Sequence, residues 1–180
     1  MFEAWHDYYL TLGAAAGALI GLLFVVATLT GDFERSRALK AVGIYMTPTM
    51  IDFATTLALS GLALAPRVSP LVVGSLIGVA ATVGLINGLR ACLGIRSLAS
   101  ADENPPHWSD FWTYGAAPTA LYLALGGVGL SIALDRRGGD HGLAAVLMAL
   151  MLLGIRNAWD LITWMAPKST EKKSPAKKPS

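Results

Sequence analysis

Apolar residues fall into five long blocks along the chain, separated by short charged segments or by segments with glycine and proline. The blocks cover about 8–30, 41–65, 70–91, 115–134 and 142–165. A membrane-spanning helix needs about 20 mostly apolar residues, so each block is long enough to cross a bilayer. The sequence therefore predicts an all-α integral membrane protein, in which residues 1–166 form one bundle of about five transmembrane helices.

The second block, 41–65, carries a regular polar pattern. Tyr45, Thr49, Asp52, Thr56 and Ser60 follow one another at spacings of three or four residues, which places them on one face of a helix. Asp52 lies ~16 Å from the inner end of the block, near the midplane of a hydrocarbon core about 30 Å thick. A carboxylate there is costly unless it is paired or hydrated, so we expect this face to be buried in protein or to line a cavity.

The end of the last block supplies candidate partners for Asp52. Arg156 and Asp160 share one helix face, and Arg156 lies about 10 Å above the inner boundary, from where its side chain can reach Asp52. Such an ion pair would offset the desolvation of Asp52. The alternative is that Arg156 pairs only with Asp160 and extends towards the inner surface. The predicted intramembrane polar network comprises Asp52, Arg156, Asp160, Asn157, Arg90, Asn87, Thr49, Thr56 and Tyr45.

Pro48 lies one turn before Asp52. A proline inside a helix leaves the carbonyl of Ile44 without its usual donor. This pattern is compatible with a plain structural kink, or with a local opening of the kind found in ion pathways.

Three glycines in the first block form a stripe of small residues. Gly13, Gly17 and Gly21 recur at every fourth position, which lets another helix approach closely. We expect a helix-packing face here, whose partner is a helix of the same chain or of a second protomer.

The segment 92–114 is predicted to be the longest loop, on the cytoplasmic side. Its second half, 105–114, is rich in aromatic residues, which is typical of a short helix at the membrane interface. The only cysteine, Cys92, is interpreted as a small packing residue, with a reactive thiol as the alternative. The following block, 115–134, is rich in glycine and is typical of helix packing.

Basic residues are distributed unequally between the two sides that five spans would create. One side holds Arg35, Arg37, Lys40, Arg90, Arg96, Lys168, Lys172, Lys173, Lys177 and Lys178, and the other holds Arg67, Arg136 and Arg137. Basic residues favour the cytoplasmic side, so the N-terminus is predicted outside and the C-terminus in the cytoplasm. The tail, 167–180, is predicted to be disordered and to be attracted to anionic lipid through its lysines.

Composition narrows the function. Of the 180 residues, 54% are hydrophobic and only 14% are charged, which excludes a soluble domain of this length. The chain carries no metalloprotease, phosphate-loop or nucleophile-elbow motif, so we expect no enzyme and no catalytic residue. Neither a cofactor nor a metal nor a nucleic-acid partner is expected. The pairs His6-Asp7 and Asp140-His141 fall on the same predicted side, and a shared metal or proton site is the alternative to plain surface residues.

Both ends of the chain resemble a known group of proteins. The residues concerned are Trp5, Tyr8-Tyr9, Gly13, Gly17 and 21–26 at the start, and 154–160 at the end. In these segments the chain is similar to a family of small bacterial multi-pass membrane proteins, some of which are labelled modulators of a membrane-bound protease. The resemblance implies a location in the bacterial inner membrane and supplies no catalytic or binding residue.

Two functions of different classes fit these observations. The first is a scaffold or modulator that binds other membrane proteins through its small-residue faces and its cytoplasmic loop. The second is an oligomeric ion or small-solute channel or transporter, in which Asp52, Arg156 and Asp160 line a polar path. The lipid bilayer is the expected environment in both cases, and a homo-oligomer is an expected assembly.

Overall fold

The computed structural model describes residues 2–29, 46–99, 109 and 111–165, and every regular element in these residues is a helix. The elements are η1 (Glu3–Trp5), α1 (His6–Leu29), α3 (Thr47–Leu64), α4 (Pro70–Ala99), η3 (Phe111–Ala116), α6 (Ala117–Ala133) and α7 (Gly139–Met165). Within the described residues, four helical segments are long and apolar enough to cross a membrane: Glu3–Thr28, Pro70–Ser97, Phe111–Ala133 and Gly139–Thr163. The prediction of an all-helical protein with helices suited to a bilayer is therefore confirmed for this part of the chain.

The helix α3 is not one of these four segments. It has 18 described residues, and it carries Asp52 together with several hydroxyl side chains, which lower its mean hydropathy. The first part of the predicted block 41–65, including Tyr45, lies outside the described residues, as does the predicted tail, 167–180.

The prediction of a loop over 92–114 is wrong in its first part, because α4 continues to Ala99. Ala91 and Ile95 are buried, so the additional turns of α4 pack against the bundle. Cys92 lies against Gly115, where an added Cβ would be 2.5 Å from the thiol sulfur. This close contact agrees with a packing role for Cys92.

Only half of the aromatic segment 105–114, predicted as a short interfacial helix, lies within the described residues. Its described part forms the π-helix η3, which runs directly into α6 and belongs to the apolar segment Phe111–Ala133. Tyr114 is buried in the bundle and Trp112 is exposed. The rings of Trp112 and Tyr114 therefore lie in the first turn of the apolar segment Phe111–Ala133.

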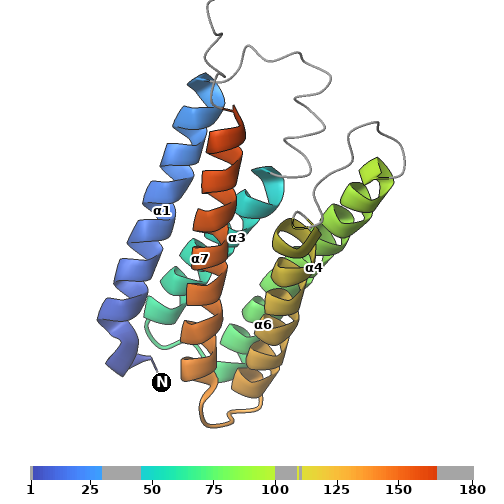
Figure 1. Ribbon diagram of the computed structural model, residues 1–180. Helices are drawn as coiled ribbons and strands as arrows, with labels where there is room; N and C mark the ends of the chain where they lie inside the picture. Colours follow the sequence, from blue (N-terminus) through green and yellow to red (C-terminus); the bar gives the residue numbers. More distant parts are fainter. Residues whose placement is uncertain (1, 30–45, 100–108, 110, 166–180) are drawn as a thin grey trace, which may run out of the picture.

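The helices form an antiparallel bundle in which the chain reverses direction from one long helix to the next (Figure 1). The central helix is α3, which contacts α1, α4 and α7, whereas α4 packs most extensively on α6. The N-terminus, the α3–α4 turn and the α6–α7 turn lie at the same end of the bundle (Figure 1). Both turns are tight, since Arg67 and Asp135 have φ values of 58° and 52°, and Gly138 has a φ of 88°.

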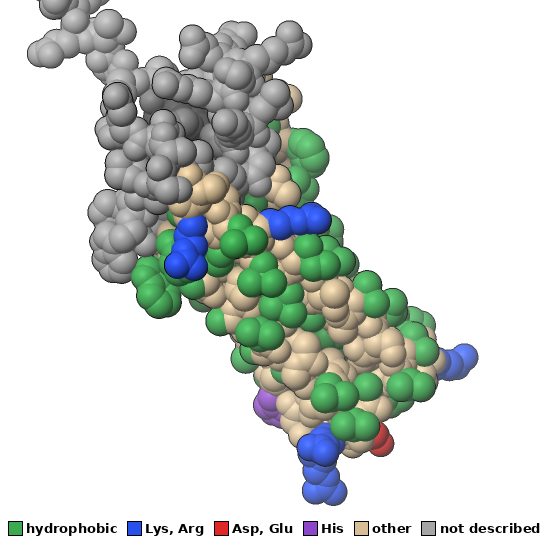
Figure 2. Space-filling view, turned by 90° about the vertical axis from the view of Figure 1, so that its right-hand side faces the viewer, with side chains coloured by type: hydrophobic (Ala, Val, Ile, Leu, Met, Phe, Trp, Pro, Cys, Tyr) green, Lys and Arg blue, Asp and Glu red, His purple; other side chains and the backbone are tan. Residues whose placement is uncertain are grey.

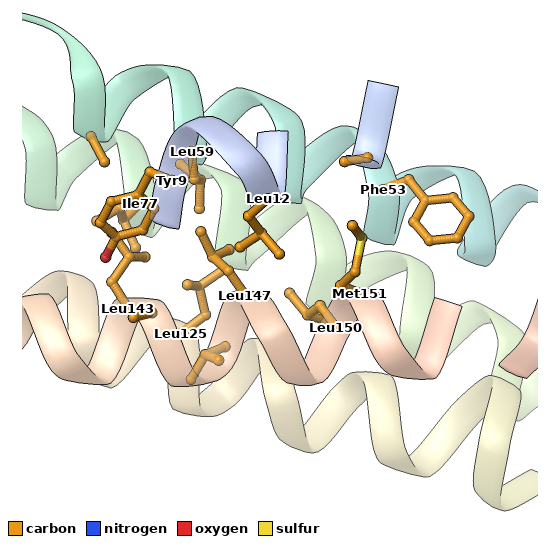
Figure 3. Close-up of a cluster of buried hydrophobic side chains, with 14 of the residues drawn as sticks. Tyr9, Leu12, Phe53, Leu59, Ile77, Leu125, Leu143, Leu147, Leu150 and Met151 are labelled. Atoms are coloured by element: carbon orange, nitrogen blue, oxygen red, sulfur yellow. The ribbon is translucent and has the colours of Figure 1, made fainter. Parts of the chain in front are cut away.

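Side chains from all five long helices fill the interior. Figure 3 shows Leu143, Leu147, Leu150 and Met151 of α7 packed among Tyr9 and Leu12 of α1, Phe53 and Leu59 of α3, Ile77 of α4 and Leu125 of α6. Other large apolar side chains point outward, as on α4, where Leu71, Val79 and Leu93 are exposed. Hydrophobic side chains are spread along the middle of the face in Figure 2, with Lys and Arg nearer its ends. This distribution is compatible with a bilayer around the middle of the bundle.

We expect Gly74→Ala to destabilise the bundle. A Cβ at this position would meet backbone atoms of Gly129 and Ala133 on α6, which cannot rotate away. Overpacking of this kind costs about 1–3 kcal/mol. The matched control is Gly78→Ala on the same helix, where no atom lies within 4 Å of the added Cβ. Unfolding in mixed micelles should show a loss only for Gly74→Ala, and an equal loss in both variants would contradict the close α4–α6 approach.

Candidate intramembrane polar site

The polar face of α3 points into the bundle. Its buried members are Thr49, Asp52, Thr55, Thr56 and Ser60. The opposite face is apolar and open, with Leu57 41% exposed. This face was expected either to be buried in protein or to line a cavity, and within the described residues it is buried in protein.

A tyrosine of another helix binds Asp52. The Tyr122 hydroxyl lies 3.0 Å from Asp52 Oδ1 and 3.2 Å from Thr55 Oγ1. The exposed fractions of Asp52 and Tyr122 are each 1%. Gly84 of α4 provides the space for the Tyr122 ring, because a Cβ there would overlap the ring atoms. We call Asp52, Thr55 and Tyr122 the Asp52 node; it joins α3 to α6 against α4.

Two buried polar atoms of α3 have no hydrogen-bond partner in the described part of the protein: Asp52 Oδ2 and Ser60 Oγ. Thr56 is satisfied within its own helix, since its Oγ1 donates to the Asp52 carbonyl at 2.9 Å. Among the described residues, Asp52 therefore has one side-chain hydrogen-bond partner for its two oxygens.

Pro48 lies in the first turn of α3 as described. A proline there removes no hydrogen bond of the described helix, because the first N–H groups of a helix have no partner within it. The Ile44 carbonyl, at which a kink or opening was predicted, lies outside the described residues.

The predicted ion pair between Asp52 and Arg156 is not formed. Arg156 Nη2 lies 3.5 Å from Asp160 Oδ2, and Arg156 Nη1 donates to Asn157 Oδ1 at 3.3 Å. The side chains of Arg156 and Asp160 are 46% and 48% exposed. The structure thus has the alternative arrangement, in which Arg156 pairs with Asp160 on its own helix.

The helical repeat explains why Arg156 and Asp52 do not meet. Gly154 faces the interior, where a Cβ would lie 2.6 Å from the ring of Phe53, the residue next to Asp52. Two residues further, at 3.6 residues per turn, the helix has rotated by about 200°, so Arg156 faces outward. The predicted network is therefore divided into the inward Asp52 node and an outward Arg156–Asp160 pair.

Asn157 is fully buried and belongs to a second polar contact. Its side-chain Nδ2 donates to the backbone carbonyl of Thr113 at 3.0 Å. Its backbone carbonyl accepts a hydrogen bond from the Tyr114 hydroxyl at 2.9 Å. These bonds fix η3 to α7. Through Asn157 Oδ1, this contact also includes Arg156.

The remaining predicted polar residues on α4 do not join either group. Asn87 Nδ2 donates to the Val83 carbonyl of its own helix at 2.9 Å. Arg90 is exposed on the surface of the same helix. Both lie apart from the Asp52 node.

Two glycines of the predicted packing stripe face α3. A Cβ on Gly13 would lie 3.1 Å from Ser60 Cβ, and one on Gly17 would lie 3.9 Å from Leu57 Cδ1. Gly21 has no atom within 4 Å of such a Cβ. The neighbour of Gly13 and Gly17 is therefore a helix of the same chain.

Tyrosines of α1 bind backbone carbonyls of α7 near the end of the bundle that holds the N-terminus. Tyr8 donates to the Ala144 carbonyl at 2.8 Å, and Tyr9 donates to the Asp140 carbonyl at 3.1 Å. These bonds tie the first described helix to the last.

The two predicted Asp-His pairs remain local. His6 Nδ1 lies 3.2 Å from Asp7 Oδ1, and His141 Nδ1 lies 2.9 Å from Asp140 Oδ1. The His141 ring also contacts the Trp5 ring edge to face, at 5.1 Å between centroids. Within the described ranges, no three His, Cys, Asp or Glu residues are grouped as metal ligands.

Tyr122 and Thr55 are the members of the node that sequence reasoning missed. Tyr122 lies in a glycine-rich block, which indicated packing alone. A usable signal was present, since a hydroxyl within an apolar segment needs an intramembrane partner. Thr55 was overlooked because it lies one residue outside the strict spacing of the polar stripe.

Comparison of the chain with family models, with curated proteins and with solved structures gives no match.

Double-mutant cycles should separate the two polar groups. We expect Asp52→Ala and Tyr122→Phe to be non-additive by about 0.5–3 kcal/mol in unfolding free energy, because these side chains are in contact. Asp52→Ala and Arg156→Gln should add within about 0.5 kcal/mol, because they share no partner. The measurement is reversible unfolding in mixed micelles. A clear coupling between Asp52 and Arg156 would contradict this division.

Proposed function

We propose that this protein is a small multi-pass protein of the bacterial inner membrane that acts as a scaffold or modulator of other membrane proteins. In this proposal the chain crosses the membrane five times, with α3 as part of one span. The N-terminus is outside and the C-terminus is in the cytoplasm. It has no catalytic role.

The outward ion pair on α7 is the observation that carries the proposal. Arg156 lies seven residues, ~10 Å, inside the end of the apolar segment Gly139–Thr163. It is half exposed together with Asp160, and Trp159 beside them is 68% exposed. Charges that face lipid at this depth are costly. A polar group on a transmembrane helix of another protein would satisfy the pair, which supports a protein partner at this face.

The burial of the Asp52 node favours a scaffold over a pore. The Tyr122 ring fills the space beside Asp52, and the node is almost fully buried. Arg156 and Asp160, which a polar path was expected to share with Asp52, lie on the other side of α7. A channel or transporter built from an oligomer remains the second candidate, favoured by the unpartnered Asp52 Oδ2.

Charge at the two ends of the bundle supports the orientation. The end that holds the N-terminus has three basic residues in its two turns, Arg67, Arg136 and Arg137, whereas the sequence segments assigned to the other side carry ten Lys and Arg residues. We expect a reporter fused before Met1 to be accessible from the periplasm, and one fused after Ser180 to be active in the cytoplasm. Reporters that place both ends on one side would remove a span and overturn the five-span proposal.

Affinity capture after crosslinking in membranes tests the scaffold role. We expect a stoichiometric membrane protein to be recovered with the wild type and to be lost with the double variant Arg156→Leu/Asp160→Leu, which removes the charged docking group. The matched control, Arg136→Gln, removes a charge outside the apolar segments and should retain the partner. Chromatography in detergent checks that each variant is folded. A partner bound equally by the double variant would exclude this face.

Flux measurements in proteoliposomes distinguish the second candidate. Movement of ions or protons that is lost in Asp52→Asn, without a captured partner, would favour transport. Capture of a partner without flux would favour the scaffold.

A further inference from the structure

The hydrogen bonding of Asp52 is too sparse for an ionised carboxylate. An ionised carboxylate offers about four lone-pair sites to donors. Here Oδ1 has the Tyr122 hydroxyl, Oδ2 has no partner in the described part, and the residue is 1% exposed. A full charge in this environment would lack both water and donors.

No cation faces Asp52 from the described helices packed around α3. The described part of α1 contains neither Lys nor Arg, and α4 presents Gly84 to the Tyr122 ring. From α6 the facing titratable group is Tyr122 itself. On α7, Gly154 packs against Phe53, while Arg156 turns outward. The negative charge would therefore have no counterpart nearby.

From this arrangement we infer that the Asp52 node is a proton-binding site, in which Asp52 is held as a neutral carboxylic acid at neutral pH. The acid proton on Oδ1 is donated to the Tyr122 oxygen, and the Tyr122 hydroxyl is donated in turn to Thr55 Oγ1. Both distances, 3.0 Å and 3.2 Å, fit these two bonds. Oδ2 then remains a neutral carbonyl oxygen, which is much cheaper to leave unpaired than an ionised one.

In the ionised form Tyr122 would donate to Asp52 Oδ1, but Oδ2 would still lack a donor in the described part of the protein, and no Lys or Arg of the described helices faces it. The neutral acid is therefore the form that this arrangement holds. The inference is independent of the scaffold role, because it concerns the inward node and not the outward face of α7.

Infrared spectroscopy of the full chain in lipid tests this inference. The wild type at neutral pH should show a C=O stretching band of a protonated carboxylic acid, shifted to lower frequency by D2O and by ¹³C labelling of aspartate. Asp52→Asn should lose the band. Asp140→Asn, at the exposed end of α7, is the matched control and should keep it.

Tyr122→Phe provides a second readout in case Asp52→Asn does not fold. The band should persist in this variant and move to higher frequency, because the acid loses its hydrogen-bond acceptor. Absence of an acid band in the folded wild type at neutral pH would overturn the inference. A band that survives in folded Asp52→Asn, or that does not respond to Tyr122→Phe, would do the same.

Discussion

The hydrogen bond between Tyr122 and Asp52 is the interaction on which the arrangement of the helices depends. A bilayer offers no donor to a carboxyl group, so Asp52 must find one in the protein. The partner is the Tyr122 hydroxyl of α6, which can donate to or accept from a carboxyl group, and it reaches Asp52 only if the polar face of α3 is turned inward. With that face inward, α3 takes the central position and α1, α4 and α7 cover it. The long helix that is not among the four apolar segments of the described part is thus the one whose polar face is covered by the others.

Close approach of the backbones makes this bond possible. The Tyr122 ring fits only because position 84 of α4 has no side chain, and Phe53 packs where α7 has Gly154. Small residues thus replace the hydrophobic drive that is missing between helices in lipid. The glycines and the Asp52 node depend on each other, because the glycines bring the helices near enough for one hydroxyl of α6 to reach the carboxyl group on α3.

The sequence was sufficient to predict helices, the approximate extents of α1, α6 and α7, and the inward polar face of α3. These features follow from apolar length and helical period, which are local properties. Tyr122 was not predicted as the partner of Asp52, because the length and the charge of its side chain favoured Arg156. The direction in which Arg156 points depends on which stripe of α7 packs inward. The inward stripe of α7 includes Leu147, Leu150, Gly154 and Leu161, and their helical spacing in the sequence indicates that they share one face. The continuation of α4 past Cys92 was not predicted, because the uncharged stretch that includes Pro70 ends at Arg90 whereas the helix does not.

The two polar groups are separate in the membrane but are connected through α7 and η3. Arg156 binds Asn157, Asn157 binds the Thr113 carbonyl, and η3 continues into α6, which carries Tyr122. This continuity is spatial and is not by itself energetic coupling, which needs an element with two arrangements that both groups bias. The longest hydrogen bond in the series is the 3.3 Å bond from Arg156 to Asn157, whereas Asn157 is held to η3 by bonds of 3.0 and 2.9 Å. A displacement of the half-exposed Arg156 side chain can therefore be taken up at its own weak bond, before it reaches η3 and the helix that carries Tyr122.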